Sequence, residues 1–164
     1  MTFLEKKPPH PRNIAFWLGT GLGSGLTPKA PGTAGSLAAL PFIYGAGLIA
    51  GPTGIAAFLL IWIAASLFTA PGFERAYSDD PALFVADEWA GQAVPFIGIS
   101  FTGSLATDIP ILLAGFILFR IFDITKPLGI KKAEKLPSPL GILADDLLAG
   151  LYALLLLKLL IMFL

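Results

Sequence analysis

The chain has no cysteine and a single histidine, His10, among its 164 residues. The absence of cysteine excludes disulfides, thiolate nucleophiles and zinc–thiolate sites. The lone histidine excludes histidine-based triads, phosphohistidine chemistry and multi-histidine metal centres. Charged residues are also scarce, at 13% against about a quarter in an ordinary soluble domain. The net charge is zero, so nothing in the composition indicates nucleic-acid binding.

Apolar residues are in excess, at 55% of the chain with a mean hydropathy of +0.80. Long apolar segments without period-two alternation predict helices throughout. We therefore expect a polar N-terminal tail, residues 1–12, followed by one membrane-embedded all-α domain, residues 13–164. Several segments fall short of the roughly 20 residues that a crossing needs, so a soluble bundle stays open as the alternative. The apolar segments are residues 36–50, 55–70, 84–99, 109–122 and 140–164.

A Gly/Pro-rich stretch near the N-terminus, GTGLGSGLTPKAPGTAGS from Gly19 to Ser36, predicts an irregular loop. Glycines let the backbone approach a ligand, and successive N–H groups in tight turns bind anions. Thr33 or Ser36 can cap the helix that follows, and a helix N-terminus favours a phosphate. A flexible linker is the alternative. The predicted phosphate-binding residues are Lys29, Gly32, Thr33 and Ser36.

The connections between apolar segments sort into two sets by charge. If the helices cross back and forth, the N-terminal part, residues 73–88 and residues 120–146 share one end, which holds nearly every charge. Residues 51–54, residues 100–108 and the C-terminus share the other end, which includes Asp108. The positive-inside rule makes the charged end cytoplasmic.

Five acidic residues lie in or beside apolar segments at this charged end. Buried charge is costly unless it is paired or bound to a metal, and carboxylates without histidine or cysteine suit Mg²⁺. Pairing with Arg120, Lys126 or backbone amides is the alternative. Neighbouring helical residues differ by about 100°, so at most one acid of each adjacent pair is expected to point squarely inward. Gly91 and Gly150 predict close helix contacts. The acids are Asp87, Glu88, Asp123, Asp145 and Asp146.

Four motifs in order resemble those of the phosphatidylglycerophosphatase A family. They are GTGLGSG with PKAPGTAGS, VADEWAGQ, FRIFDITKP and GILADDLLAG, and they span residues 19–150. The resemblance implies a bundle of about six helices around a central helix. It also implies a Mg²⁺-dependent phosphatase of the bacterial inner membrane that makes phosphatidylglycerol from phosphatidylglycerophosphate. The family's motif regions correspond to Lys29, Thr33, Asp87, Glu88, Arg120, Asp123, Lys126, Asp145 and Asp146.

These positions suggest roles for a phospholipid substrate in a bilayer. Asp123, held by Arg120, is a further metal ligand or the base that aligns water, and Lys126 holds a phosphate oxygen. Attack by water and a covalent phospho-enzyme, the number of metals and the oligomeric state stay open. An ion-coupled transporter, with acids that bind the coupling ion, is the alternative function. The predicted Mg²⁺ ligands are Asp87, Glu88, Asp145 and Asp146.

Overall fold

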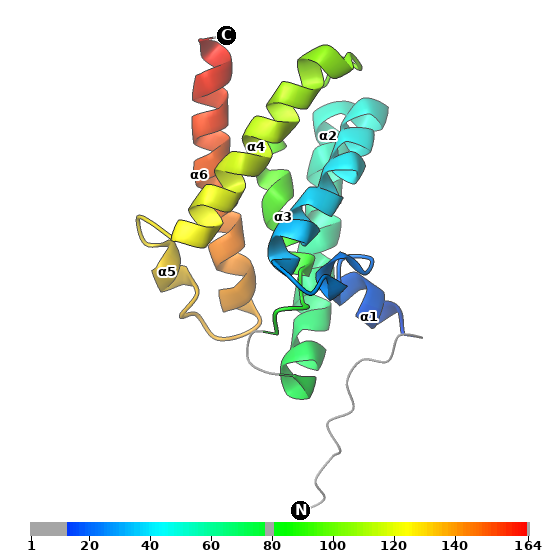
Figure 1. Ribbon diagram of the computed structural model, residues 1–164, viewed down its shortest axis with the longest axis vertical. Coiled ribbons are helices and arrows are strands. Elements are labelled where there is room, and N and C mark those ends of the chain that lie inside the picture. The colour runs from blue at the N-terminus through cyan, green and yellow to red at the C-terminus, as the bar shows by residue number, and fades with distance from the viewer. Residues whose placement is uncertain (1–12, 78–80, 164) are drawn as a thin grey trace, which may run out of the picture.

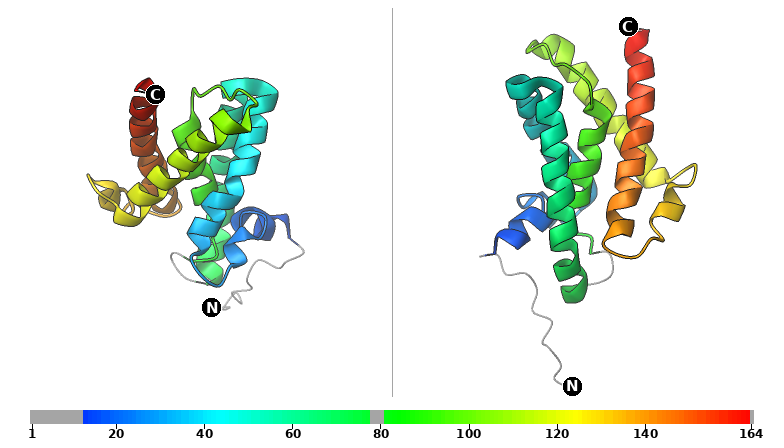
Figure 2. Two further views of the ribbon diagram at one scale, coloured as in Figure 1. Left: turned by 45° about the horizontal axis from the view of Figure 1, so that its top comes forward. Right: turned by 180° about the vertical axis from the view of Figure 1, so that it is seen from behind.

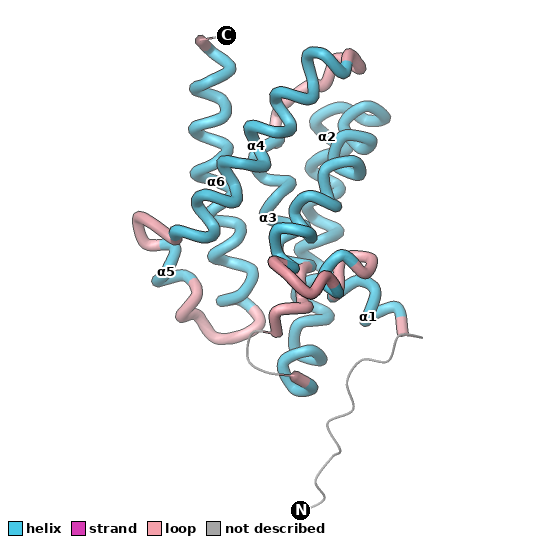
Figure 3. The backbone as a smooth tube through the Cα atoms, in the orientation of Figure 1, coloured by secondary structure: helices cyan, strands magenta, loops and turns pink. Residues whose placement is uncertain are grey.

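The computed structural model describes residues 13–77 and 81–163, and over this part of the chain it contains helices, turns and no strand (Figures 1 and 3). The all-α class and the expected number of helices are confirmed. The predicted tail, residues 1–12, lies outside the described residues. The α-helices are α1 (Ile14–Gly19), α2 (Pro31–Ala76), α3 (Ala86–Ala93), α4 (Leu105–Thr125), α5 (Ile130–Ala133) and α6 (Leu140–Met162), and the 3₁₀ turns are Ser24–Leu26 and Val94–Phe96.

Helix α2 is a hairpin with two antiparallel arms (Figure 2). Ala50 and Gly51 leave the helical region at its bend, where Gly51 has φ +58° and ψ −148°, a conformation that glycine adopts readily. The two arms correspond to the predicted segments 36–50 and 55–70. The second arm passes the expected stop at Pro71 and continues to Ala76, because fully buried packing of Phe73 offsets the backbone hydrogen bond that proline removes.

The start of α2 differs from the prediction. The helix begins at Pro31, inside the expected irregular stretch, because proline is well suited to the first helical position. Its N-cap, Ala30, makes no side-chain capping hydrogen bond. The prediction that Thr33 or Ser36 caps the helix is wrong, since both lie within its first turns and Ser36 Oγ donates to the Gly32 carbonyl at 2.8 Å.

The connections gather at the two ends of the bundle, as the charge pattern predicted (Figure 1). Helix α1, the start of α2 and helix α5 lie at one end, and the bend of α2, the segment before α4 and the end of α6 lie at the other. Side-chain packing agrees, because Gly47 near the bend faces Phe101. Helices α2, α4 and α6 are each long and apolar enough to cross a membrane.

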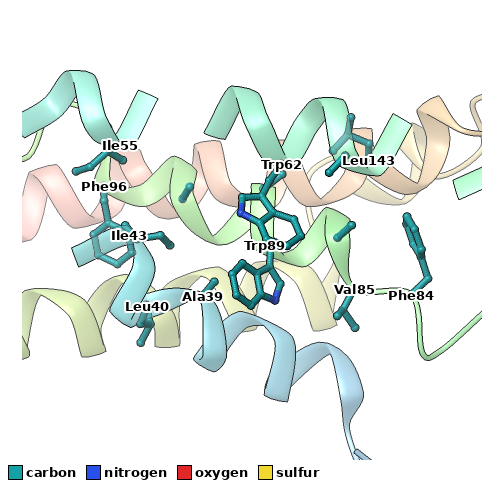
Figure 4. Close-up of a cluster of buried hydrophobic side chains, with 14 of the residues drawn as sticks. Ala39, Leu40, Ile43, Ile55, Trp62, Phe84, Val85, Trp89, Phe96 and Leu143 are labelled. Carbon is teal, nitrogen blue, oxygen red and sulfur yellow. The ribbon is translucent and has the colours of Figure 1, made fainter. Parts of the chain in front are cut away.

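Helix α3 occupies the centre of the bundle, as expected for the central helix. All of its residues except Glu88 are buried. The ring centroids of Trp89 and Trp62 lie 4.2 Å apart (Figure 4). The Trp89 indole N–H donates to Ser24 Oγ at 3.3 Å. Eight residues span only about 12 Å, so the apolar segment 84–99 forms a short buried helix and a 3₁₀ turn where a crossing was expected.

Helices α3 and α6 approach closely at two glycines, which confirms the predicted contact. A Cβ at Gly150 would lie 2.5 Å from the carbonyl oxygen of Gly91, and a Cβ at Gly91 would lie 2.9 Å from Asp146 Cβ. This approach brings the acidic residues of α6 beside those of α3.

We expect Gly150→Ala to destabilise the fold by about 1–3 kcal/mol, the usual cost of overpacking. The helix propensity of alanine acts in the opposite direction by up to about 1 kcal/mol. Thermal unfolding in detergent measures the difference. Gly45→Ala is the matched control, because a Cβ there meets nothing within 4 Å and the variant should be neutral or slightly stabilised. Equal losses at both positions would contradict the packing explanation.

Candidate active site

A cavity of about 450 Å³ opens at the charged end of the bundle. Its walls come from the end of α2, from α3, from the end of α4, from the α5–α6 connection and from the start of α6, and all five predicted acids line it. Lys126 also lines it, whereas Arg120 does not. The carboxylates in the wall belong to Glu74, Asp87, Glu88, Asp123, Glu134, Asp145 and Asp146.

Three helices supply the five predicted acids, and the helix dipole favours only those at the start of α3. Asp87 and Glu88 occupy the first turn of α3, where the helix dipole stabilises negative charge. Asp123 lies in the last turn of α4, and Asp145 and Asp146 face the cavity from α6. Asp146 is only 4% exposed, so its charge depends on partners inside the site.

The acids form two groups that share one member. In each group, one carboxylate oxygen from every residue lies within 4.8 Å of the others. The expectation that at most one acid of each pair points inward is wrong, because the cavity lies where α3, α4 and α6 meet and both acids of a pair line it. The groups are Asp87, Glu88 and Asp146, and Asp123, Asp145 and Asp146.

Within the described part of the chain, two cations are paired with this cluster. Arg120 Nη1 lies 2.7 Å from Asp123 Oδ2 and donates to Ser36 Oγ at 3.3 Å, so the predicted arginine–aspartate pair is present. Lys126 Nζ lies 2.6 Å from Asp145 Oδ2 and 3.4 Å from Glu134 Oε2. Burial lowers the pKa of Lys126, but the hydrogen bond and charge of Asp145 outweigh burial and raise it above the usual value.

Some carboxylate oxygens in the cavity lack a protein partner. Glu88 Oε2 and Asp145 Oδ1 are buried and accept no hydrogen bond from the described residues. Burial raises the pKa of Glu88 to about 6, because a buried carboxylate loses the water that stabilises its charged form. Clustered, under-coordinated carboxylate oxygens fit a hard divalent cation, whose ligands are oxygens of this kind.

None of the predicted phosphate-binding residues lines the cavity, and three of the four lie beside it. Gly32 packs against Glu88 so tightly that a Cβ would overlap Glu88 Oε1. Ser36 accepts a hydrogen bond from Arg120, which in turn pairs with Asp123 of the cluster. Thr33 and Arg120 both line a neighbouring groove. Lys29 is exposed, and the structure does not bring it to the cavity.

Sequence reasoning missed three polar residues of the cavity wall: Glu74, Glu134 and Ser138. Ser138 Oγ donates to the Glu74 carboxylate, which joins the end of α2 to the segment before α6. One signal was available, since Glu134 is the single acid in the basic segment 128–139. Glu74 and Ser138 lie in no motif, and only the tertiary fold brings them together.

The comparisons with known proteins agree with the motif pattern. The family model for phosphatidylglycerophosphatase A matches residues 17–161. A Haemophilus influenzae protein named phosphatidylglycerophosphatase A is 37% identical over 146 residues, which cover 86% of this chain and 85% of the relative. An Escherichia coli protein of the same name is 33% identical over 135 residues, covering 81% and 75%.

A third relative carries a different name. A Bacteroides thetaiotaomicron protein named "Putative phosphatidylinositol-3-phosphatase" is 36% identical over 149 residues, which cover 87% of this chain and 91% of the relative. No solved structure matches the chain significantly. The family model spans most of the chain, including every acid of the cavity, and two of the relatives share its name. The chain therefore belongs to the phosphatidylglycerophosphatase A family and is a phosphatase.

Proposed function

We propose that this protein hydrolyses the phosphomonoester of phosphatidylglycerophosphate to phosphatidylglycerol and phosphate. The reaction takes place at a Mg²⁺-dependent site on the cytoplasmic face of the bacterial inner membrane. Family membership and the names of two relatives support the reaction. The observation that supports the metal dependence is that the acids form two groups of three residues, and that Asp146 belongs to both.

The cluster has more negative charge than the protein compensates. Among the described residues, the two groups contain five acids, and two cations, Arg120 and Lys126, pair with them. A phosphomonoester adds roughly a further −2 near pH 7. We therefore propose two Mg²⁺ sites, one in each group, and Asp146, which belongs to both groups, would help to hold both ions. Bound there, Mg²⁺ supplies charge neutralisation at the phosphate and acidifies a bound water.

The chain's own residues position the reactants. Arg120 fixes the Asp123 carboxylate through their 2.7 Å ion pair, so Asp123 is held in place as a ligand for the ion of the second group and would orient the attacking water from there. Lys126 places a fixed positive charge in the cavity wall for a phosphate oxygen. The first backbone N–H groups of α2, near Gly32 and Thr33, are suited to the remaining phosphate charge.

The position of the acids favours catalysis over ion-coupled transport. A transporter binds its coupling ion near the middle of the membrane, between broken helices. Here the two carboxylate groups gather at the end of the bundle where α4 stops and α6 begins. A cluster at this end fits a headgroup reaction at the membrane surface.

We expect purified protein to release phosphate from phosphatidylglycerophosphate in the presence of Mg²⁺. Excess EDTA should abolish this release because the carboxylate cluster then lacks its counter-charge, and added Mg²⁺ should restore it. Phosphatidylinositol 3-phosphate is the comparison substrate, since one relative carries that name. Turnover that persists in EDTA would show that the acids are structural. Faster release from the inositol lipid would overturn the proposed substrate.

A further inference from the structure

A groove of about 330 Å³ runs between the start of α2 and the second half of α4, next to the carboxylate cavity. We propose that this groove holds the diacylglycerol end of the lipid substrate, which reaches the cavity sideways from the bilayer. The inference rests on the proposed function, because it assigns a place to the part of that substrate which does not react.

The groove has the composition of a surface that faces lipid chains. Ile117, Ile121 and Ile124 line it at helical spacings of four and three residues, so they share one face of α4. Their side chains are 53%, 50% and 67% exposed. Helix α4 is long and apolar enough to cross a membrane, which places this exposed isoleucine row against acyl chains.

Arg120 connects the groove to the cavity. It lines the groove, and it forms the ion pair with Asp123, which lines the cavity. Its Nε is buried and has no hydrogen-bond partner among the described residues. The substrate's phosphodiester lies between its acyl chains and its terminal phosphate. A lipid with its acyl chains in the groove and its terminal phosphate in the cavity therefore brings that phosphodiester to Arg120. A guanidinium pairs well with a phosphate.

The groove positions the lipid without extracting it. Lipid tails are as apolar as isoleucine, so a chain gains no hydrophobic free energy on moving from the bilayer into the groove. A site reached only from water would instead require the chains to leave the membrane, which is strongly unfavourable. The groove should therefore contribute alignment, and its loss should affect the diacyl substrate alone.

Ile121→Trp tests the proposal by filling the groove. We expect kcat/KM for diacyl phosphatidylglycerophosphate in mixed micelles to fall by about tenfold or more, the scale of a lost positioning contact. Hydrolysis of the deacylated, water-soluble headgroup should stay within about twofold of wild type. Ile109→Trp is the matched control, because Ile109 is 44% exposed on the same helix, outside the groove, and both rates should remain near wild type.

Two outcomes would overturn the groove and leave the proposed function standing: equal losses on both substrates, or no loss on either. If wild-type protein hydrolyses neither substrate, the proposed function fails. A binding measurement then tests whether the groove holds the acyl chains. Phosphatidylglycerol with diazirine-bearing acyl chains should crosslink to residues 116–125 more strongly than phosphatidylcholine with the same chains. Equal labelling by the two lipids would overturn the proposal.

Discussion

Asp146→Asn should lower kcat for phosphatidylglycerophosphate by about two to three orders of magnitude, the loss seen when one electrostatic stabiliser is removed from an active site. The amide keeps the shape of the side chain and removes its charge. Asp146 is the residue that both carboxylate groups contain, and it is almost fully buried. The substitution should therefore weaken both proposed metal positions together. Phosphate release at saturating lipid and Mg²⁺ measures the effect.

Binding of Mn²⁺ provides a readout that does not depend on turnover. Wild-type protein should bind two Mn²⁺ ions that are magnetically coupled in electron paramagnetic resonance, since two-metal sites have ions about 3.5–4 Å apart. Asp146→Asn should bind fewer ions without coupling. A single, uncoupled ion in wild-type protein would contradict the two-ion site.

Asp108→Asn separates stability from catalysis. Asp108 is fully buried at the opposite end of the bundle, where it accepts hydrogen bonds from the Thr102 and Gly103 backbone N–H groups and from the Tyr44 hydroxyl. Its replacement should lower thermal stability and leave the Mn²⁺ count unchanged. If it reduced the Mn²⁺ count of the folded protein as much as Asp146→Asn, the assigned site would be wrong.

Gly32→Ala should reduce activity by about 10²-fold, the cost of a displacement of roughly 1 Å at a reacting centre. An added Cβ at Gly32 overlaps Glu88 Oε1, so the Glu88 carboxylate must leave its place beside Asp87 and Asp146. The side chain can swing at small energetic cost, and the thermal stability should remain within about 0.5 kcal/mol of wild type. Steady-state kinetics and thermal unfolding, measured on the same preparation, separate the two effects.

Gly45→Ala is again the control, because the same substitution in the same helix meets open space. Wild-type activity in Gly32→Ala would mean that Glu88 does not act where the structure places it. A loss of activity with an unchanged Mn²⁺ count would instead favour the predicted contact between the substrate phosphate and the Gly32 backbone.

The sequence was sufficient to find most of the candidate site because its acids are physically conspicuous. Asp145 and Asp146 interrupt an apolar segment, and charge in such a place needs a partner whatever the fold. The Arg120 and Asp123 pair follows from helical spacing alone. These inferences depend only on residues near one another in the sequence, so they do not require knowledge of the tertiary structure.

Other features depend on how distant segments meet. Apolar content does not distinguish a membrane crossing from a short helix buried by its neighbours, which is why α3 was expected to be longer. The density of glycines predicted a loop as far as Ser36. Gly32 and Gly35 instead lie inside α2, where they leave room for Glu88 and Val85 to pack closely against the helix. Glu74 reaches the cavity only because the second arm of α2 continues past Pro71.

The indole of Trp89 has a practical consequence for spectroscopy. Trp89 follows Glu88 directly in α3, and its indole N–H donates to Ser24 in the glycine-rich loop. Its ring is tilted by 37° against that of Trp62, with 4.2 Å between the ring centroids. The chain contains only three tryptophans. Any adjustment of the first turn of α3 as a cation arrives would change the quenching of this pair. The unlabelled protein should therefore report a Mg²⁺ titration through its own emission, in the absence of lipid and of turnover.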